Sequence, residues 1–308
     1  MGLEEMSGRG VKLLFLGTSG SIPTKERNLS SVVMKYNSEL LMFDCGEGTQ
    51  RQMGIAKLSL AKKMKIFISH MHGDHVLGLP GLFQSMALLG RQNDLDIYGP
   101  RGIRKFVESV NKTVQFNLSF LLHVHEVKAG RIDNEKLYEV HSAWTDHVIP
   151  CLGYSFVEKP KPGRFNVQIA RRLQIPEGPL WKTLQMGKPV KVKGRKIDPR
   201  LVVGPSRPGI KVTYATDTRP APGVVFLASR ADVLIHDACF DSSLEEKASQ
   251  DGHSTAAQAA RVAKRGKVRK LILTHISARY RDASILLKEA KKVFPNSVVA
   301  SDLMTVDL

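Results

Sequence analysis

Hydrophobic residues fall into short runs along the chain, separated by stretches in which apolar and polar residues recur at helical spacing. The runs predict strands at residues 11–16, 31–36, 40–44, 64–68, 95–98, 116–127, 137–142, 152–157, 211–215, 231–238, 270–273 and 297–300. The amphipathic stretches predict helices at residues 49–55, 79–89, 102–111, 224–229, 256–264 and 283–293. Because strands alternate with helices and several strands follow one another directly, we predict an α/β protein with two sheets packed face to face and helices outside.

The pattern changes between residues 158 and 209. Apolar periodicity is weak there outside residues 165–173, prolines and glycines interrupt the chain, and cations far outnumber Glu158, Glu177 and Asp198. We interpret residues 159–209 as a basic arm inserted into a single domain that spans residues 1–308. The alternative is a solvated basic loop without a partner.

Charge favours a polyanionic partner. The chain has 308 residues, with 46 basic and 29 acidic side chains, a formal net charge of +17 and a pI of about 9.8. Basic side chains gain free energy by releasing counterions from phosphates, so a nucleic acid is the first expectation. A generally basic proteome is the alternative explanation.

Other bulk features point to the cytoplasm. No apolar run approaches the ~18–20 residues of a membrane span, and residues 1–10 contain no apolar signal-peptide core. Only Cys45, Cys151 and Cys239 are present, which argues for a reducing compartment and against a disulfide framework. We therefore expect a cytoplasmic protein that makes no membrane contact.

The most informative stretch packs three histidines and an aspartate into six residues. His70, His72, Asp74 and His75 follow the predicted strand 64–68 and precede a helix. Side chains two apart on an extended segment point the same way, so His70 and His72 can converge on one point, while Asp74 and His75 face a second. This arrangement is typical of a two-metal site at the carboxyl edge of a sheet. A metal-scavenging surface tract is disfavoured, because the stretch is not of low complexity.

Three further metal-capable residues each fall beside a predicted strand end. His147 precedes the strand 152–157, Asp217 follows the strand 211–215 and His275 follows the strand 270–273. Together with the four above they make seven candidate ligands, about the number that two zinc ions bridged by a water require.

The chain resembles a known family in its motifs. The pattern His-x-His-x-Asp-His at residues 70–75 resembles the signature of the metallo-β-lactamase superfamily. Four further segments are similar to motifs of its ribonuclease Z family, and the resemblance runs from about residue 11 to residue 301. These segments are residues 23–28, residues 44–50, Gly178-Pro179 with the residues up to Gly187, and His253-Ser254-Thr255.

The resemblance implies a fold and a set of ligands. It implies the four-layer αββα sandwich with an inserted, flexible, tRNA-binding arm. One zinc would be held by His70, His72, His147 and Asp217, and the other by Asp74, His75, His275 and the shared Asp217. Manganese or iron are alternatives, since nitrogen and oxygen ligands also suit those metals.

The resemblance also implies an activity, namely metal-dependent removal of the 3′ trailer from precursor tRNA by a homodimer. Asp74 would orient the attacking water and take its proton, and His253 would protonate the leaving 3′ oxygen. The products would be a tRNA with a 3′-hydroxyl and a trailer with a 5′-phosphate. Asp251, Asp237 or a backbone group could orient His253, and these alternatives stay open.

The resemblance further implies which side chains bind substrate. Lys25, Arg27 and Asn28 are expected at the 3′ end of the tRNA. The arm residues expected to contact tRNA are Lys161, Arg164, Arg171, Arg172 and Lys182. His123 and His125 are interpreted as structural or exposed, and Cys45 and Cys151 as packed thiols.

Two other functions remain open. One is a phosphodiesterase of the same fold that acts on small phosphodiesters or on other RNA. The other is a basic RNA-binding protein whose metal site is only structural.

Overall fold

The computed structural model describes residues 10–308 and divides them into two compact units. Unit 1 comprises the residues up to 134, residues 140–156 and residues 211–308, and unit 2 comprises residues 135–139 and 157–210. The predicted insertion, residues 159–209, falls within unit 2. The N-terminal segment on which the signal-peptide expectation depends lies almost entirely outside the described residues. Within residues 10–308, no helix has the length and apolar character needed to cross a bilayer.

The first sheet carries the N-terminal half of the chain and the last strand. Its strands are β1 (Lys12–Gly17), β3 (Ser31–Tyr36), β4 (Glu39–Phe43), β5 (Met64–Phe67), β6 (Leu95–Gly99), β7 (Leu122–Glu126) and β18 (Thr305–Asp307). They lie in the order β18-β1-β3-β4-β5-β6-β7. Pairing is parallel from β4 to β7, and β3 and β4 form an antiparallel hairpin.

The second sheet carries the C-terminal half. Its strands are β8 (Gly130–Asn134), β9 (Tyr138–Trp144), β10 (Leu152–Glu158), β13 (Lys211–Ala215), β14 (Val233–Asp237), β15 (Lys270–Thr274) and β17 (Ser297–Val299). They lie in the order β17-β15-β14-β13-β10-β9-β8, and β13, β14, β15 and β17 are parallel. The two-residue strands β2 (Ser19–Gly20) and β16 (Ile276–Ser277) form a separate parallel pair.

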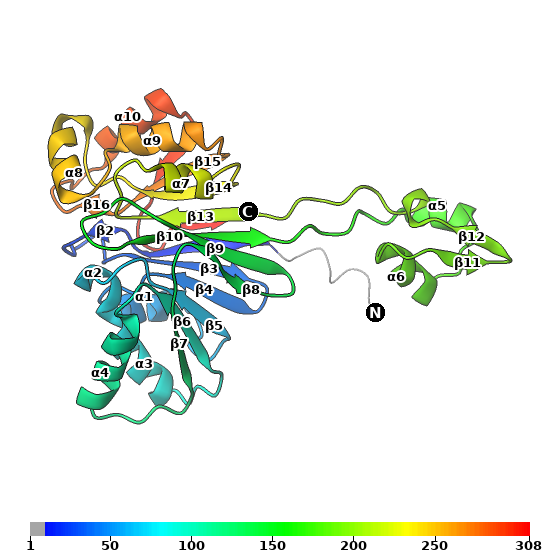
Figure 1. The fold of residues 1–308 in the computed structure, drawn as a ribbon, viewed down its shortest axis with the longest axis horizontal. Coiled ribbons are helices and arrows are strands. Elements are labelled where there is room, and N and C mark those ends of the chain that lie inside the picture. Colours follow the sequence, from blue (N-terminus) through cyan, green and yellow to red (C-terminus); the bar gives the residue numbers. More distant parts are fainter. Residues whose placement is uncertain (1–9) are drawn as a thin grey trace. The chain divides into compact units, whose positions relative to one another are not determined.

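Helices cover the outer face of each sheet (Figure 1). On the first sheet these are α1 (Thr49–Ile55), α2 (Gly73–Val76), α3 (Gly78–Leu88) and α4 (Ile103–Thr113). On the second sheet they are α7 (Pro222–Leu227), α9 (Ala256–Arg265) and α10 (Ser284–Val293). The helix α8 (Glu245–Asp251) follows the 3₁₀ turn η2 (Ser242–Leu244) and packs with Cys239 and Phe240 through Ala248. Unit 1 therefore has the four layers, helix–sheet–sheet–helix, that the sequence predicts.

Alternation along the strands explains why both faces of each sheet are apolar. Leu40 and Met42 of β4 pack with the helices of the first sheet. Phe43 points the other way, towards the second sheet, and stacks on Phe67 and on Tyr214 with ring centroids 5.5 and 5.4 Å apart. Residues one apart on a strand face opposite sides, so one strand supplies two cores. Parallel strands covered on both faces read as the continuous apolar runs seen in the sequence.

Parallel pairing brings strand ends together. In the first sheet the carboxyl ends of β4 and β5 lead directly to Asp44 and to Ser69-His70. In the second sheet the ends of β13, β14 and β15 lead to Asp217, Asp237 and His275. Carboxyl ends of neighbouring parallel strands share one edge, where ligand sites of α/β proteins gather.

Unit 2 has a small core of its own. It contains α5 (Val167–Arg172), α6 (Pro179–Gln185), the hairpin β11 (Val190–Val192) and β12 (Arg195–Ile197), and the 3₁₀ turn η1 (Pro199–Leu201). Trp181 lies at the centre, with its ring 5.1 Å from that of Phe165 and its indole N–H donated to the Ile175 carbonyl at 3.0 Å. The core residues are Ala170, Ile175, Trp181, Leu184, Val190, Val192, Ile197 and Val202.

Two expectations about local structure are wrong. The strand predicted at residues 116–127 is only β7, residues 122–126, because Phe116 and Leu118 pack against the helical side of the first sheet instead of joining the ladder. The basic stretch was expected to contain little regular structure outside residues 165–173, but it contains the β11–β12 hairpin. The valines of β11 alternate with lysine in the two-residue period of a strand.

Candidate metal centre

The first four candidate ligands lie on a tight strand-to-helix connection. After β5 ends at Phe67 the chain passes through the buried Ser69 and His70, and His72 precedes the first residue of α2. Asp74 and His75 lie in the single turn of α2. Gly78 fixes the approach of this segment, because a Cβ there would lie 2.0 Å from the carbonyl oxygen of Gly46.

Three residues of the site have left-handed backbone conformations. Asp44 (φ 57°), Asp217 (φ 54°) and His275 (φ 59°) each follow the end of a strand, β4, β13 and β15 respectively. Aspartate and histidine are among the non-glycine residues that tolerate this conformation best. It turns the chain sharply after the strand, and such strained positions typically cluster at functional sites.

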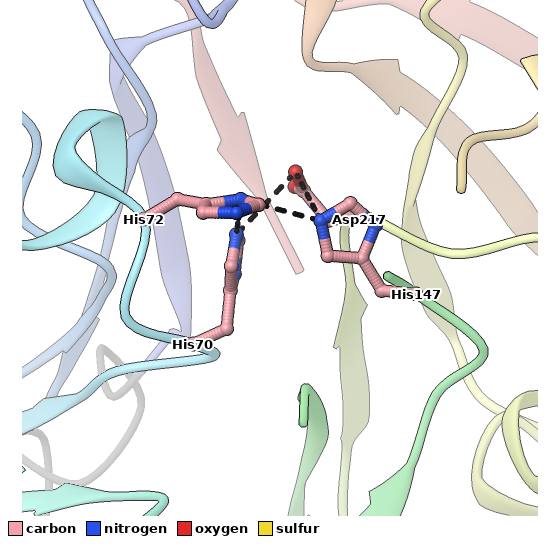
Figure 2. Close-up of side chains that lie close together, drawn as sticks. All are labelled: His70, His72, His147 and Asp217. Atoms are coloured by element: carbon pink, nitrogen blue, oxygen red, sulfur yellow. Dashed lines mark hydrogen bonds and ion pairs between the residues drawn. The ribbon is translucent and has the colours of Figure 1, made fainter. Parts of the chain in front are cut away.

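Cluster 1 gathers His70, His72, His147 and Asp217 (Figure 2). His72 Nδ1 lies 3.0 Å from His70 Nε2 and 3.3 Å from His147 Nε2. Asp217 Oδ2 lies 3.7 Å from His70 Nε2 and 4.0 Å from His147 Nε2. All four ligand atoms are within 4.8 Å of one another. Three imidazoles and one carboxylate oxygen therefore face a common point.

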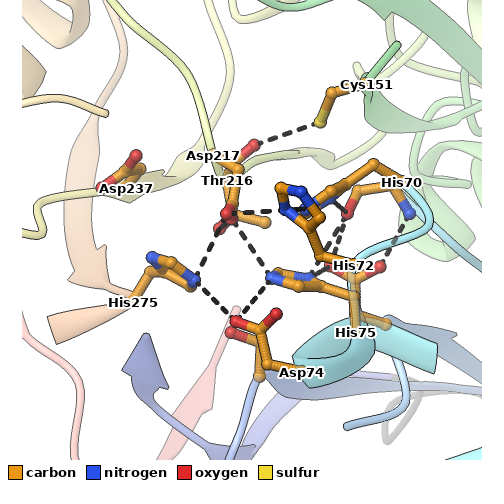
Figure 3. Close-up of polar contacts among 12 residues, drawn as sticks. His70, His72, Asp74, His75, Cys151, Thr216, Asp217, Asp237 and His275 are labelled. Atoms are coloured by element: carbon orange, nitrogen blue, oxygen red, sulfur yellow. Dashed lines mark hydrogen bonds and ion pairs between the residues drawn. The ribbon is translucent and has the colours of Figure 1, made fainter. Parts of the chain in front are cut away.

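Cluster 2 gathers Asp74, His75 and His275, with Asp217 beside them (Figure 3). Asp74 Oδ2 lies 3.3 Å from His75 Nε2 and 3.4 Å from His275 Nε2. Asp217 Oδ1 lies 3.4 Å from His75 Nε2, and its Oδ2 lies 3.4 Å from His275 Nε2. Asp217 thus borders both clusters, and its role as a shared metal ligand stays a prediction.

The donor set fits a metal at both clusters. His75 Nε2 is buried and has no hydrogen-bond partner among the described residues, although it faces two carboxylates. The other nitrogen of the ring, Nδ1, lies 2.7 Å from Asp44 Oδ2. His147 Nδ1 is likewise 2.9 Å from the Gly252 carbonyl. Histidine ligands are usually oriented in this way, with the outer nitrogen bonded so that the inner nitrogen stays free for a metal.

Electrostatics distinguish the two clusters. Burial, reinforced by the neighbouring His75, holds the pKa of His70 well below its usual range, and burial also lowers the pKa of His147. Burial alone would lower the pKa of His275 too, but Asp217 and Asp74 raise it to about 9. His70 and His147 of cluster 1 are therefore neutral imidazoles ready to donate lone pairs, whereas the surroundings of His275 in cluster 2 favour positive charge.

His253 lies beside both clusters. Its ring stacks on His275 with centroids 5.1 Å apart and lies 5.3 Å from the ring of His147. His253 Nδ1 is 2.8 Å from Asp237 Oδ2, which settles the open question of its partner in favour of Asp237. Burial would lower the pKa of His253, but Asp237 raises it to about 9, so the imidazolium form is favoured.

The segment around His253 is fixed from both sides. Gly252, with φ +81°, leaves no room for a side chain, because a Cβ would lie 2.6 Å from His147 Nδ1. Thr255 then caps α9, accepting a hydrogen bond from the Gln258 N–H at 3.2 Å while the Gln258 side chain bonds the Thr255 N–H at 2.8 Å. This reciprocal capping box confirms the predicted helix start.

Sequence reasoning missed Asp44 as a functional residue and left Asp237 as one of several options. Asp44 is fully buried and accepts four contacts, from the Ser69 N–H (2.7 Å), the Ser69 hydroxyl (2.8 Å), His75 Nδ1 (2.7 Å) and the Tyr214 hydroxyl (2.7 Å). The available signal was the same as for Asp217: an aspartate directly after a buried strand.

The predicted substrate-binding loop is only partly free. Lys25 is exposed. Arg27 donates to the Thr18 hydroxyl and to the Ala300 carbonyl, both at 2.7 Å, and the Asn28 amide donates to the Glu47 carbonyl at 2.9 Å. Arg27 and Asn28 therefore hold the loop in place, and their contact with a substrate stays a prediction.

The predicted arm residues lie in unit 2. Arg164, Arg172 and Lys182 are exposed, and no ion pair is formed by them among the described residues. Lys161 pairs with Glu158 at 2.8 Å, and Arg171 lies 3.8 Å from Glu177. Their role towards a substrate also stays a prediction.

The residues set aside in the sequence behave as expected. His123 pairs with Asp94, just before β6, at 3.1 Å, and His125 pairs with Asp96 of β6 at 2.9 Å; both histidines are partly exposed. Cys45, Cys151 and Cys239 are free and buried. Cys239 lies near His253 and His275, but burial raises the pKa of its thiol.

Comparison with known proteins places this geometry in a family. A family model described as "Beta-lactamase superfamily domain" matches residues 190–276, and one described as "Anti-Pycsar protein Apyc1" matches residues 11–149. A protein named ribonuclease Z from Methanosarcina acetivorans is 46% identical over 299 residues, covering 97% of this chain and 98% of its own. Ribonuclease Z from Nitrosopumilus maritimus is 41% identical, covering 97% of this chain and 100% of its own.

Solved structures agree with the sequence relatives. Human tRNase Z, short form, superposes with a TM-score of 0.71 at 28% identity, covering 96% of this chain and 98% of its own. The metallo-β-lactamase fold protein YhfI from Bacillus subtilis superposes with a TM-score of 0.70 at 18% identity, covering 97% of this chain and 100% of its own. The predicted metallo-β-lactamase sandwich is thereby confirmed.

Proposed function

Because the chain belongs to the ribonuclease Z family, we propose that it is an endoribonuclease that removes the 3′ trailer from precursor tRNA. The observation that carries the proposal is the pair of ligand clusters joined by Asp217, with the imidazolium of His253 beside them. The products are a tRNA with a 3′-hydroxyl and a trailer with a 5′-phosphate.

The residues that would hold two divalent ions are those of the two clusters. His70, His72 and His147 with Asp217 would hold the first, and Asp74, His75 and His275 with Asp217 the second. We propose zinc, whose preferred ligands are imidazole nitrogens and carboxylate oxygens in this number, with manganese or iron as alternatives. Bound divalent ions supply water activation near neutral pH and neutralise charge on the phosphate.

Asp74 would act as the general base. Burial would raise its pKa, but the neighbouring imidazoles of His275 and His75 hold the pKa well below its usual range, so the group is a carboxylate. Its Oδ2 is engaged by the Ser21 N–H at 2.9 Å and approached by His75 and His275. The carboxylate is therefore fixed in orientation, as a group that orients water and accepts its proton must be.

His253 would act as the general acid. As the water oxygen bonds to phosphorus, the bond from phosphorus to the 3′ oxygen breaks. The imidazolium of His253 delivers its proton to that oxygen, which leaves as a hydroxyl. Asp237 stabilises the proton on His253 until transfer, because its Oδ2 bonds the opposite ring nitrogen at 2.8 Å.

Unit 2 would bind the body of the tRNA. Between residues 157 and 210, thirteen lysines and arginines stand against three acidic residues. A groove of about 720 Å³ within the unit is lined by glycines and prolines, by Lys196 and by Arg200, which pairs with Asp198 at 2.7 Å. Small side chains beside cations suit close approach of a phosphate backbone, which positions RNA without reading its sequence.

We propose further that the protein is a cytoplasmic homodimer, the commonest symmetric assembly of soluble proteins. Sedimentation of the purified chain at several concentrations tests the dimer; a single species of 34.1 kDa at all concentrations would contradict it.

The deciding experiment is cleavage of a trailer-bearing tRNA transcript with both ends of the cut mapped. We expect one cut at the trailer junction, leaving a 3′-hydroxyl and a 5′-phosphate. Turnover of bis-p-nitrophenyl phosphate, measured in parallel, separates this activity from that of a general phosphodiesterase. Efficient hydrolysis of the small diester without cleavage of the transcript would refute the proposal.

A further inference from the structure

A short loop, residues 18–28, lies between cluster 2 and the C-terminal segment that contains Asp302. Its base is closed by the N–H groups of Thr18 and Ser19, which both donate to the Asn28 carbonyl at 2.9 Å. Within the loop the Thr24 N–H bonds the Arg27 carbonyl at 2.8 Å, and the Ser19 hydroxyl bonds the Ile22 carbonyl at 2.6 Å. The loop is thus a closed, internally bonded structure.

The tip of this loop touches Asp74. The N–H of Ser21, a residue with φ 60°, donates to Asp74 Oδ2 at 2.9 Å. Asp74 Oδ2 is the same oxygen that faces His75 and His275 in cluster 2. A backbone N–H at a fixed position therefore sets the rotation of the carboxylate.

The loop also touches His275. Gly20 lies against the imidazole so closely that a Cβ at this position would be 2.7 Å from both Cε1 and Nδ1 of His275. The parallel pairing of Ser19 with Ile276, and the hydrogen bond from the Ile276 N–H to the Thr18 carbonyl at 2.9 Å, hold the two segments together. Two ligands of cluster 2 are thus packed against one loop.

Asp302 holds the loop from the C-terminal side. One carboxylate oxygen accepts the Thr18 hydroxyl at 2.7 Å, and the other accepts the Asn28 N–H at 2.7 Å and the Gln52 amide at 2.9 Å. Arg27 adds bonds to the Thr18 hydroxyl and to the Ala300 carbonyl, each at 2.7 Å. Asp302 therefore bonds both ends of the loop and ties them to α1.

We propose that Asp302 is a positioning residue for cluster 2. By fixing both ends of the loop, it places the Ser21 N–H against Asp74 and Gly20 against His275, and so sets the affinity for the second metal ion. His70, His72 and His147 make no hydrogen bond to this loop among the described residues, so cluster 1 is independent of it. The proposal rests on the proposed two-metal function.

Metal binding by the full chain, stripped of metal and titrated with Co²⁺ while the absorption spectrum is followed, tests this. In Asp302→Asn we expect the second equivalent to bind about tenfold or more weakly, the effect typical of losing an outer-shell contact. The first equivalent should bind as in the parent. Asp302→Glu, which keeps the charge, should recover part of the loss.

A second variant reaches the same cluster without altering Asp302. Gly20→Ala places a methyl group against His275 and should weaken the second equivalent in the same selective way. The matched control is Asp307→Asn, a carboxylate five residues along the chain that pairs with Lys12 at 3.2 Å on the surface. It should bind both equivalents as the parent does.

The outcomes separate this proposal from the proposed function. If Asp302→Asn binds two equivalents with parental affinity, the positioning role is refuted. Should Asp302→Asn fail to fold, Asp302→Glu decides in its place, and parental affinity for the second equivalent in that variant would refute the role. A parent that binds two ions but does not cut precursor tRNA would refute the proposed substrate and leave the positioning role standing, because the Co²⁺ readout does not depend on RNA.

Discussion

The two units of the molecule use charge in opposite ways. In unit 1 the site charges are buried and each has several fixed partners; Asp44 alone accepts four contacts. In unit 2 the cations are mostly exposed, and Arg164, Arg172 and Lys182 form no ion pair among residues 10–308. Chemistry at a phosphorus atom needs charges placed to fractions of an ångström, whereas attraction of a polyanion needs only their density.

This contrast predicts that single substitutions in unit 1 are severe and that single substitutions in unit 2 are mild and additive. The comparison can be tested at four levels, each with a smaller expected effect than the one before.

The largest effect is expected at Asp74. Asp74→Ala removes the proposed base and a ligand, and should reduce tRNA cleavage by at least about 10³-fold, within the range of general-base contributions. Binding of the RNA, measured by filter retention, should stay near the parental value. Asp94→Ala is the control, because Asp94 is an exposed carboxylate outside the two clusters that contacts His123 and the Leu121 N–H. Binding that falls together with cleavage would contradict the assignment of Asp74.

The next effect comes from removing the basic surface as a whole. Deletion of residues 161–196 should reduce cleavage of precursor tRNA strongly, though less than Asp74→Ala does, and spare hydrolysis of bis-p-nitrophenyl phosphate, because the small diester does not need the basic surface. The deletion also removes most of the unit 2 core, including Trp181. A variant with Arg164, Arg172 and Lys182 changed to glutamine keeps that core and serves as its matched partner. Equal loss of both activities would count against a binding role.

A smaller effect is expected at Asp237, and it depends on pH. Asp237 raises the pKa of His253, so Asp237→Asn lowers it. The acid form is then lost at lower pH, and the alkaline limb of the kcat profile should move towards lower pH. Near neutral pH the rate should fall by about tenfold, less than the full 10²–10⁴-fold worth of a general acid. An unchanged alkaline limb would show that Asp237 does not support the proton on His253.

The smallest effect is expected from one exposed cation. Lys182→Gln should weaken tRNA binding a few-fold and reduce the slope of log K against log salt by about 1, as loss of one phosphate contact does. The kcat for bound tRNA should not change. A loss as large as that at Asp74 would remove the distinction between the two units.

The candidate ligands that the structure brings together could be nominated from sequence, while the residues that orient them could not. His70, His72, Asp74 and His75 form one local pattern, and His147, Asp217 and His275 each adjoin a strand, so local structure is enough to nominate them. Asp44 and Asp237 also follow or end strands, but their importance depends on which imidazole they meet. The contact between Asp44 and His75 joins residues that are 31 positions apart, and the contact between Asp237 and His253 joins residues that are 16 positions apart. Only the packed fold decides these contacts.

The core of unit 2 was overlooked for a related reason. Trp181, Val190 and Ile197 are scattered among lysines, so the stretch looks polar on average. Its apolar residues become a core only when the hairpin closes, at Lys193 and Gly194 with φ 47° and 81°. Positive φ at both central residues is typical of the tight hairpin turns that match strand twist.

The position of Asp217 between the clusters has a thermodynamic consequence. One carboxylate facing both groups of ligands means that two cations would not bind independently, because whichever cation binds first fixes the carboxylate for the other. Such linkage is reciprocal: each cation changes the affinity for its neighbour by one common factor. The first cation should therefore either raise or lower the affinity for the second, so that their binding free energies do not simply add. Asp217→Asn should remove this coupling.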